Sequence, residues 1–234
     1  MPILLIEDLN YSYISKSQRT DAIRDANYVF ESGQVYVIMG KSGSGKTTLL
    51  SLLAGLDKPL SGQISLDGEG LESMDISRYR RDKVAMIYQQ FNLLPLLSVQ
   101  ENVMYPMVLS GVSKPEAQQR SVERLRELGL GEQFDRRLPH TLSGGEQQRV
   151  AIARALCMPA RVILADEPTG SLDSENSKII MGILKDLAHE KGYLVIIVTH
   201  DPAVAEHGDT CLRMDAGRFP VLTKTNHWNN QINS

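Results

Sequence analysis

The sequence predicts an α/β fold built on a mostly parallel sheet. Four short runs are apolar and rich in β-branched residues, as expected of strands buried on both faces. These runs are residues 35–39, 84–88, 161–167 and 194–198. A glycine-rich loop at 40–47 joins the first run to a good helix former at 48–54, which Gly55 ends. The 234 residues and the apolar fraction of 42% suit one large domain with a sub-domain inserted.

Composition excludes several classes of function. The net charge of −3 provides no basic footprint for nucleic acid. Cys157 and Cys211 lie far apart without metal-ligand spacing, which fits a reducing compartment. Residues 1–8 lack the basic region of a signal peptide, and no run approaches the roughly 18 apolar residues that span a bilayer. We therefore expect a cytosolic protein that reaches a membrane only through a partner.

The glycine-rich loop carries the clearest chemistry. Residues 40–47 read GKSGSGKT and fit the pattern G-x-x-x-x-G-K-[ST]. Backbone N–H groups of such a loop and of the following helix bind phosphate oxygens. Lys46 would reach the β- and γ-phosphates, and the Thr47 hydroxyl would bind Mg²⁺. The strand before and the helix after the loop argue against a merely flexible turn. The predicted nucleoside triphosphate site contains Gly40, Lys41, Ser42, Gly43, Ser44, Gly45, Lys46, Thr47 and Thr48.

The segment before this loop is expected to be β-rich. Residues 3–9 and 26–30 read as strands, and residues 14–21 between them are polar and loop-like. Tyr11 and Tyr13 lie at the end of the first strand. Either ring can be a half-buried strand aromatic, or a plate that stacks on a purine base.

Polar residues follow the next strand. Residues 61–68 alternate and then turn, as a hairpin strand does, and the basic run 78–83 reads as a solvated helix face. The strand at 84–88 ends on Gln89, at the strand end where α/β proteins hold ligands. Gln89 is therefore a candidate for contact with Mg²⁺ or with the attacking water.

The middle of the chain predicts helices. Residues 91–108 are unusually apolar and either form the core of a helical sub-domain or leave a groove open to a partner. A helix is expected over 113–128. Another opens at Ser143, which with Glu146 forms a capping box. A cap does not require Gly144 and Gly145, which weaken the first turn by roughly 1 kcal/mol each. Paired glycines there suggest the close approach of an anion.

Acids and a histidine follow the last two strands. Asp166 and Glu167 end the third run, where one carboxylate would hold hydrated Mg²⁺ and the other would take a proton from water. The alternative is a pair of acids that stabilises a helix start before Pro168. His200 follows the fourth run, at the edge where the phosphates must lie. The remaining histidines, His140, His189, His207 and His227, are expected to be structural.

The C-terminal third predicts one helix and a hairpin. A tight turn at 170–173 leads into a helix with one apolar face that stops at Gly192. Residues 211–219 are expected to form a hairpin, and the uncharged tail at 225–234 is expected to fray.

In combination these motifs resemble the nucleotide-binding subunit of ATP-binding cassette (ABC) transporters over essentially the whole chain. The corresponding motifs are Walker A (40–47), the glutamine loop (Gln89), the signature (142–146), Walker B with its catalytic glutamate (162–167), the D-loop (171–173), the switch histidine (His200) and the base-stacking aromatic (Tyr13). The resemblance implies a RecA-like P-loop NTPase core at about 1–90 and 157–224. An antiparallel β sub-domain and an inserted helical sub-domain at about 91–156 complete the single domain of residues 1–224.

The resemblance also implies roles and partners. Two copies would form a head-to-tail dimer, and each ATP would lie between Walker A of one chain and the signature and D-loop regions of the other. The residues of those regions are Ser143, Gly144, Gly145, Glu146 and Asp173. Lys46, Gln89, Glu167 and His200 would be catalytic, and Thr47, Gln89 and Asp166 would bind Mg²⁺. A membrane permease would dock in a groove near Gln89–Val108, which places the chain at the cytoplasmic face of the membrane. Residues 89–95 and 57–59 most resemble the MacB and lipoprotein-release (Lol) branch, in which ATP-driven closure moves an external stalk.

Two other classes of function are weighed against transport. A stand-alone cassette that clamps nucleic acid usually carries two fused cassettes or a long coiled coil, and the acidic balance disfavours it. A P-loop GTPase or kinase would leave the serine-glycine-glycine helix unexplained, and no Asn-Lys-x-Asp motif is present.

Overall fold

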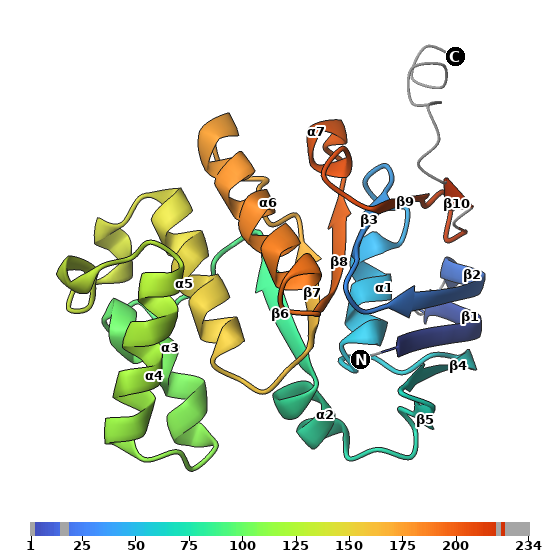
Figure 1. Ribbon diagram of the computed structural model, residues 1–234. Helices are drawn as coiled ribbons and strands as arrows, with labels where there is room; N and C mark the ends of the chain where they lie inside the picture. Colours follow the sequence, from blue (N-terminus) through green and yellow to red (C-terminus); the bar gives the residue numbers. More distant parts are fainter. Residues whose placement is uncertain (1–2, 15–18, 219–220, 223–234) are drawn as a thin grey trace.

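The computed structural model describes residues 3–14, 19–218 and 221–222, and in this part of the chain the strands form two sheets (Figure 1). The central sheet contains, in spatial order, β10 (Val221–Leu222), β9 (Thr210–Arg213), β3 (Val35–Met39), β8 (Leu194–Thr199), β7 (Val162–Asp166) and β6 (Val84–Tyr88). The second sheet contains β2 (Arg19–Glu31), β1 (Ile3–Ile14), β4 (Ser61–Leu66) and β5 (Glu69–Gly70). The α/β fold class is confirmed.

The four predicted apolar strands lie side by side in the central sheet. β3, β8, β7 and β6 are parallel, and β9 continues the parallel arrangement beyond β3. The register pairs Met39 with Thr199, and Asp166 with both Val198 and Tyr88. The carboxyl ends of these strands therefore meet at one edge, from which every loop with predicted chemistry begins.

The β1–β2 hairpin is longer than the sequence predicts. The loop expected at 14–21 is wrong at its ends, because Ile14 pairs with Arg19 inside the ladder. Polar cross-strand contacts stabilise this end: Ser12 Oγ donates to Asp21 Oδ1 at 2.8 Å, and Arg19 Nε lies 3.0 Å from the same oxygen. Such contacts leave no apolar period in the sequence, so the strand signal is absent there.

The helices fall into layers around the sheets. They are α1 (Lys46–Leu53), α2 (Ile76–Asp82), α3 (Val99–Leu109), α4 (Lys114–Glu127), α5 (Gly144–Leu156), α6 (Ser174–His189) and α7 (Pro202–Ala205), with 3-10 turns at Glu132–Phe134 and Pro139–Thr141. One core joins α1 and the second sheet to one face of the central sheet, through residues such as Tyr36 and Ile38. The other joins the opposite face, through Val35 and Val37, to α6 and to helices α3, α4 and α5.

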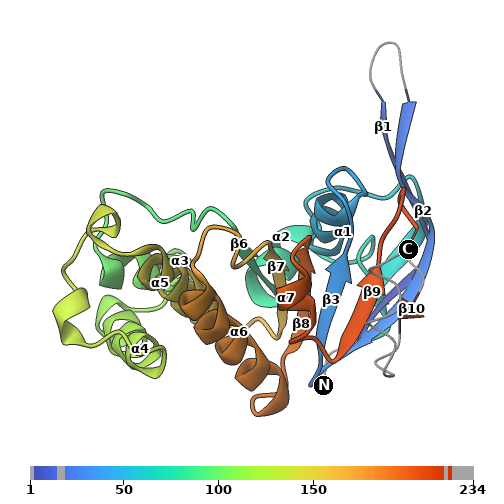
Figure 2. The same cartoon turned by 90° about the horizontal axis from the view of Figure 1, so that it is seen from above.

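Helices α3, α4 and α5 form a group beside the central sheet, away from the second sheet (Figures 1 and 2). They lie between β6 and β7 in the chain and pack on one another. Asn102 on α3 is fully buried, and its Nδ2 donates to the carbonyls of Leu94, Leu97 and Ser98. These bonds hold the apolar stretch before α3 as an ordered loop. The sub-domain boundaries at about 91–156 stay a prediction.

The C-terminal elements add one helix that the sequence did not predict. α7 begins after Asp201, whose Oδ1 accepts the N–H of Ala203 at 2.9 Å. A hairpin forms where one is expected, but its second strand lies beyond the expected range 211–219, because β10 (Val221–Leu222) pairs with Cys211 and Leu212 of β9. Asp215 and Arg218 form a bridge in the turn, and Phe219 and the tail at 225–234 lie outside the described residues. Within the described ranges no helix is long and apolar enough to cross a membrane.

Candidate functional site

The phosphate loop, residues 40–47, connects β3 to α1 as predicted. Its glycines are required by different features of the backbone. Gly45 has φ of +102°, and a Cβ there would lie 2.2 Å from the Ala22 carbonyl oxygen. A Cβ on Gly40 would lie 2.4 Å from the carbonyl oxygen of Met214. Gly43 has φ of +78°, and a Cβ there would meet open space. Two glycines thus permit close backbone packing and the third permits a left-handed turn, so the loop is fixed by its surroundings.

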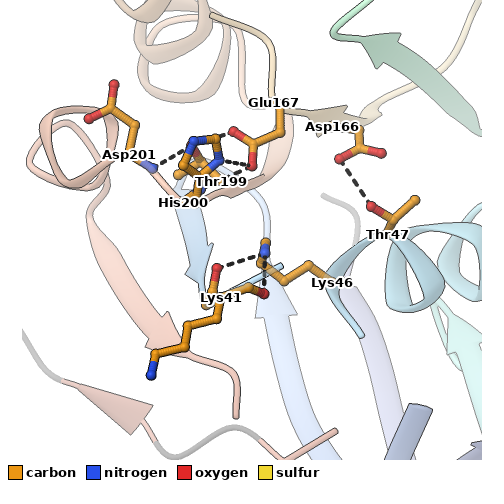
Figure 3. A network of polar contacts seen from close by, with 9 residues as sticks. Lys41, Lys46, Thr47, Asp166, Glu167, Thr199, His200 and Asp201 are labelled. Carbon is orange, nitrogen blue, oxygen red and sulfur yellow. Dashed lines mark hydrogen bonds and ion pairs between the residues drawn. The ribbon is translucent and has the colours of Figure 1, made fainter. Parts of the chain in front are cut away.

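The Lys46 side chain extends back to the start of the phosphate loop (Figure 3). Its side chain is buried, and Nζ donates to the carbonyls of Gly40 at 2.7 Å and Lys41 at 3.1 Å. Ser44 Oγ is buried without a hydrogen-bond partner among the described residues. The helix start at Gly45 has no side-chain cap, so the first N–H groups of α1 lack that partner. A loop with an ammonium, an unpaired hydroxyl and uncapped N–H groups fits a bound phosphate chain.

Thr47 and Asp166 form the candidate metal position. Thr47 Oγ1 lies 3.4 Å from Asp166 Oδ1, where α1 begins and β7 ends. Burial raises the pKa of the Asp166 carboxyl, and the negative charge of Glu167 adds to that rise, whereas the Thr47 hydroxyl and the Lys46 charge lower it. A hydroxyl and a carboxylate beside a phosphate site fit Mg²⁺, which usually takes one or two carboxylates plus substrate phosphates.

Gln89 lies at the same sheet edge but points elsewhere. A Cβ built on Gly170 would lie 2.8 Å from Gln89 Nε2, so the amide rests on the turn after β7. Ser171 Oγ donates to the Gln89 carbonyl at 3.3 Å. The described residues show no hydrogen bond between the Gln89 amide and Thr47 or Asp166. The expected contact of Gln89 with a metal therefore stays a prediction.

Glu167 is held by the end of β8 (Figure 3). Its backbone is left-handed, with φ of +47°, and its carboxylate accepts three hydrogen bonds. His200 provides two of them, from its backbone N–H at 3.0 Å and from Nδ1 at 2.7 Å. The third comes from Thr199 Oγ1 at 2.8 Å. The predicted base and the predicted switch histidine are therefore in direct contact.

Thr199 contacts the site, although the sequence did not single it out. It is buried, and its Oγ1 accepts the N–H of Asp201 at 3.0 Å, so its own hydrogen is free to point to Glu167. The signal available in the sequence was a polar residue at the end of a buried strand, directly before His200.

The start of α5 confirms the capping box and shows what surrounds one of the two glycines. Glu146 N donates to Ser143 Oγ at 3.3 Å, and Ser143 N donates to Glu146 Oε2 at 2.7 Å. A Cβ on Gly145 would lie 2.0 Å from Asn176 Oδ1 on α6. Close packing within the chain is therefore one reason for Gly145, and the approach of an anion stays a prediction. Asp173 caps α6 by accepting the backbone N–H of Asn176 at 2.8 Å. This hydrogen bond is the largest cause of the lowered pKa of the Asp173 carboxyl.

The start of α5 and the phosphate loop do not meet in one chain. α5 stands with α3 and α4, whereas α1 lies beyond β7 and β8, in both views (Figures 1 and 2). Tyr13, by contrast, is close to α1: its hydroxyl lies 2.9 Å from Thr48 Oγ1, and 51% of the residue is exposed. Its ring meets Tyr11 edge-on at 5.2 Å. The structure therefore brings together Tyr13, Lys46, Asp166, Glu167 and His200, and leaves the signature apart.

A family comparison decides the assignment. The family model described as "ABC transporter" matches residues 23–170, a range that includes the phosphate loop, the start of α5, and Asp166 and Glu167 at the end of β7. The chain belongs to the ABC transporter family. It is the ATP-binding and ATP-hydrolysing component of an ABC transporter.

Similar proteins carry the same description. The uncharacterized ABC transporter ATP-binding protein YclH of Bacillus subtilis (strain 168) is 39% identical over 94% of this chain and 97% of its own length. The macrolide export ATP-binding/permease protein MacB 1 of Yersinia pestis bv. Antiqua (strain Antiqua) is 42% identical, over 93% of this chain and 34% of its own length. The chain thus spans about a third of that ABC transporter protein.

Solved ABC cassettes share the fold. The dimeric structure of MJ0796, a bacterial ABC transporter cassette, superposes with a TM-score of 0.85 and 38% identity, covering 95% of this chain and all of the other. A dimeric post-hydrolysis state of MJ0796 bound to ADP and Pi matches equally well. The resemblance to ABC transporters is therefore confirmed, and a nucleic-acid clamp is not favoured.

Proposed function

We propose that this ABC cassette hydrolyses Mg²⁺-ATP between two copies of itself and thereby drives a membrane permease. The observation that carries the proposal is one sheet edge that holds the phosphate loop, Asp166, Glu167 and His200 while the signature lies elsewhere. A complete site then requires the start of α5 from a second chain. The test is ATP hydrolysis by the purified protein and its loss when Glu167 changes.

The mechanism is phosphoryl transfer to water. Lys46 and the N–H groups of the phosphate loop hold the phosphate chain and offset the developing negative charge. Mg²⁺ held by Thr47 and Asp166 would neutralise further phosphate charge. Glu167 orients or deprotonates the attacking water, and Thr199 and His200 fix its carboxylate for that task. Because Glu167 and His200 are hydrogen-bonded, a γ-phosphate that contacts His200 also reorients the base.

The dimer in this proposal is head-to-tail. Each ATP lies between the phosphate loop of one chain, with Tyr13 against the base, and Ser143, Gly144, Gly145 and Glu146 of the other, with Asp173 nearby. The dimeric state of the MJ0796 cassette supports this arrangement. The N-terminus of α5 is suited to meet the γ-phosphate, since within the described ranges the Ser143 side chain accepts a single hydrogen bond, from the N–H of Glu146.

The permease is proposed to dock where the central sheet meets the helical group. A groove of about 330 Å³ lies between α2, β6, α3 and α5, and is lined by Met86, Pro106, Leu109 and Met158 among others. Arg80, Arg81 and Arg154 border it, and 69% of the Leu109 surface is exposed. Of the predicted range Gln89–Val108 this groove contains Pro106. A second groove of about 620 Å³, which Gln89, Phe91 and Leu93 help to line, lies at the start of that range. An apolar floor with basic edges suits an amphipathic permease helix that carries acidic residues.

Leu109→Glu is expected to break this docking without harming the ATPase. Adding a charge to the apolar floor should abolish co-purification with the permease encoded beside this subunit, because the docked helix would bury that charge. The control is Val29→Glu on the second sheet, another exposed apolar residue outside the groove. Co-purification that is equal for the two variants would exclude the groove as the docking site.

The branch of the family is a further part of the proposal. The match to MacB 1, named a macrolide export ATP-binding/permease protein, supports an export or mechanotransmission system of the MacB and Lol type. The match to nearly the full length of YclH supports a permease on a separate chain. On this account the cassette works at the cytoplasmic face of the membrane, as one domain of residues 1–224 whose helical part at about 91–156 meets the permease.

A further inference from the structure

Gln148 is a fully buried amide that the mechanism above does not use. It lies on α5, in the turn that follows the capping box of Ser143 and Glu146. Its Nε2 donates to the carbonyl of Pro168 at 2.8 Å and lies 3.5 Å from the carbonyl of Tyr88. One side chain of the signature helix thus contacts the backbone after β7 and the backbone at the end of β6.

The positions of these two carbonyls are specific. Pro168 directly follows Glu167, and Tyr88 directly precedes Gln89. The two strands are neighbours, with Tyr88 paired to Asp166. A movement of α5 that shifts the Gln148 amide would therefore move the residue next to the proposed base, Glu167, and the residue next to Gln89 of the glutamine loop.

Packing alone is a poor explanation for an amide at this position. The other end of the side chain, Oε1, is buried without a hydrogen-bond partner among the described residues. An unpaired buried acceptor destabilises a fold, a cost that an apolar side chain would avoid and that the Nε2 contact with the Pro168 carbonyl offsets in part. The donor end, Nε2, is the part of the amide that makes contacts, with the carbonyls of Pro168 and Tyr88.

The start of α5 is also wedged against the turn that leads to α6. Gly145 packs on Asn176 with no room for a Cβ, and Asn176 Nδ2 donates to Asp173 Oδ2 at 2.8 Å. The first turn of α5 is therefore tied to its surroundings, one turn ahead of Gln148. A displacement of that turn must be transmitted to the next turn of the helix.

We propose that Gln148 is a positioning residue that links the signature helix of each chain to the Glu167 and Gln89 of the same chain. When Ser143 engages ATP in the partner's site, α5 sets the carbonyls of Pro168 and Tyr88 through the Gln148 amide. The inference rests on the proposed ATP-sandwich function, and it adds a route by which binding at one site adjusts the water-activating group of the other.

Two substitutions separate the donor from the volume of the side chain. Gln148→Met keeps the length and apolar stem but removes the donor, whereas Gln148→Asn keeps the amide and shortens its reach. Gln119→Met, on the exposed face of α4, is the matched control. Each variant is measured for thermal stability, for kcat and KM with ATP, and for ATP-dependent dimer formation in the Glu167→Gln background.

We expect Gln148→Met to keep its melting temperature and its KM to within about twofold, while kcat falls about tenfold or more because the base is misplaced. The Glu167→Gln dimer should still form, since ATP binding does not use Gln148. Gln148→Asn should lose kcat as well. A normal kcat in Gln148→Met, or a parallel loss of folding, KM and dimer formation, overturns the inference and assigns the residue to packing. Failure of the proposed function is distinguishable, because Glu167→Gln with an intact Gln148 would then form no ATP-dependent dimer.

Discussion

Glu167→Gln should bind ATP normally and hydrolyse it at least about 100-fold more slowly, the scale expected when a general base is removed. The amide has nearly the shape of the carboxylate but cannot take a proton from water. The phosphate loop, Lys46 and Thr47 are untouched, so nucleotide affinity should persist. Because ATP then stays intact, the nucleotide-bound dimer should accumulate.

Phosphate release and size-exclusion chromatography with ATP measure the two effects. Glu190→Gln is the control, since that carboxylate is exposed at the far end of α6 and contacts no part of the site. Near-normal turnover in Glu167→Gln would contradict the assignment of Glu167 as the general base. Normal turnover in the control excludes a general effect of removing one negative charge.

Lys46→Ala should abolish measurable ATP binding. The ammonium is buried at the loop, and in its place the γ-phosphate would face the carbonyls of Gly40 and Lys41, which Nζ now holds. Losing a charge-assisted contact in a buried site weakens affinity by about 100-fold or more. Calorimetric titration with Mg²⁺-ATP measures the loss.

Lys114→Ala on the exposed surface of α4 serves as the control for Lys46→Ala. Its affinity should equal that of the wild type. An unchanged affinity in Lys46→Ala would show that the phosphates bind elsewhere, and with it the identification of the loop would fail.

Local patterns in the sequence predicted the strands that build the site. The apolar runs at β3, β6, β7 and β8 are long enough, and bounded clearly enough, to be recognised singly. Their shared edge follows from parallel pairing, so the sequence alone sufficed to place Asp166, Glu167 and His200 together. The capping box at Ser143 was likewise readable, because its two partners are three residues apart.

Contacts between distant segments were not predictable in the same way. A Cβ on Gly145 would collide with Asn176, and no local pattern joins these residues. Thr199 holds Glu167 through a hydrogen bond across two strand ends. The end of the β1–β2 hairpin depends on Ser12, Arg19 and Asp21 meeting across the ladder. In each case tertiary packing, which has no period in the sequence, decides the geometry.

The central claim is that Lys46 and Ser143 of different chains complete one site, and mixing two inactive variants tests it most directly. Lys46→Ala lacks the ammonium, whereas Ser143→Asp keeps a good helix cap but sets a negative charge against the phosphates. Neither variant alone should hydrolyse ATP. In a head-to-tail dimer, the mixed pair contains one site with an intact Lys46 and an intact Ser143. An equal mixture should therefore recover up to about a quarter of wild-type turnover, since half of the dimers are mixed and each has one working site. A mixture as inactive as its components would contradict the account.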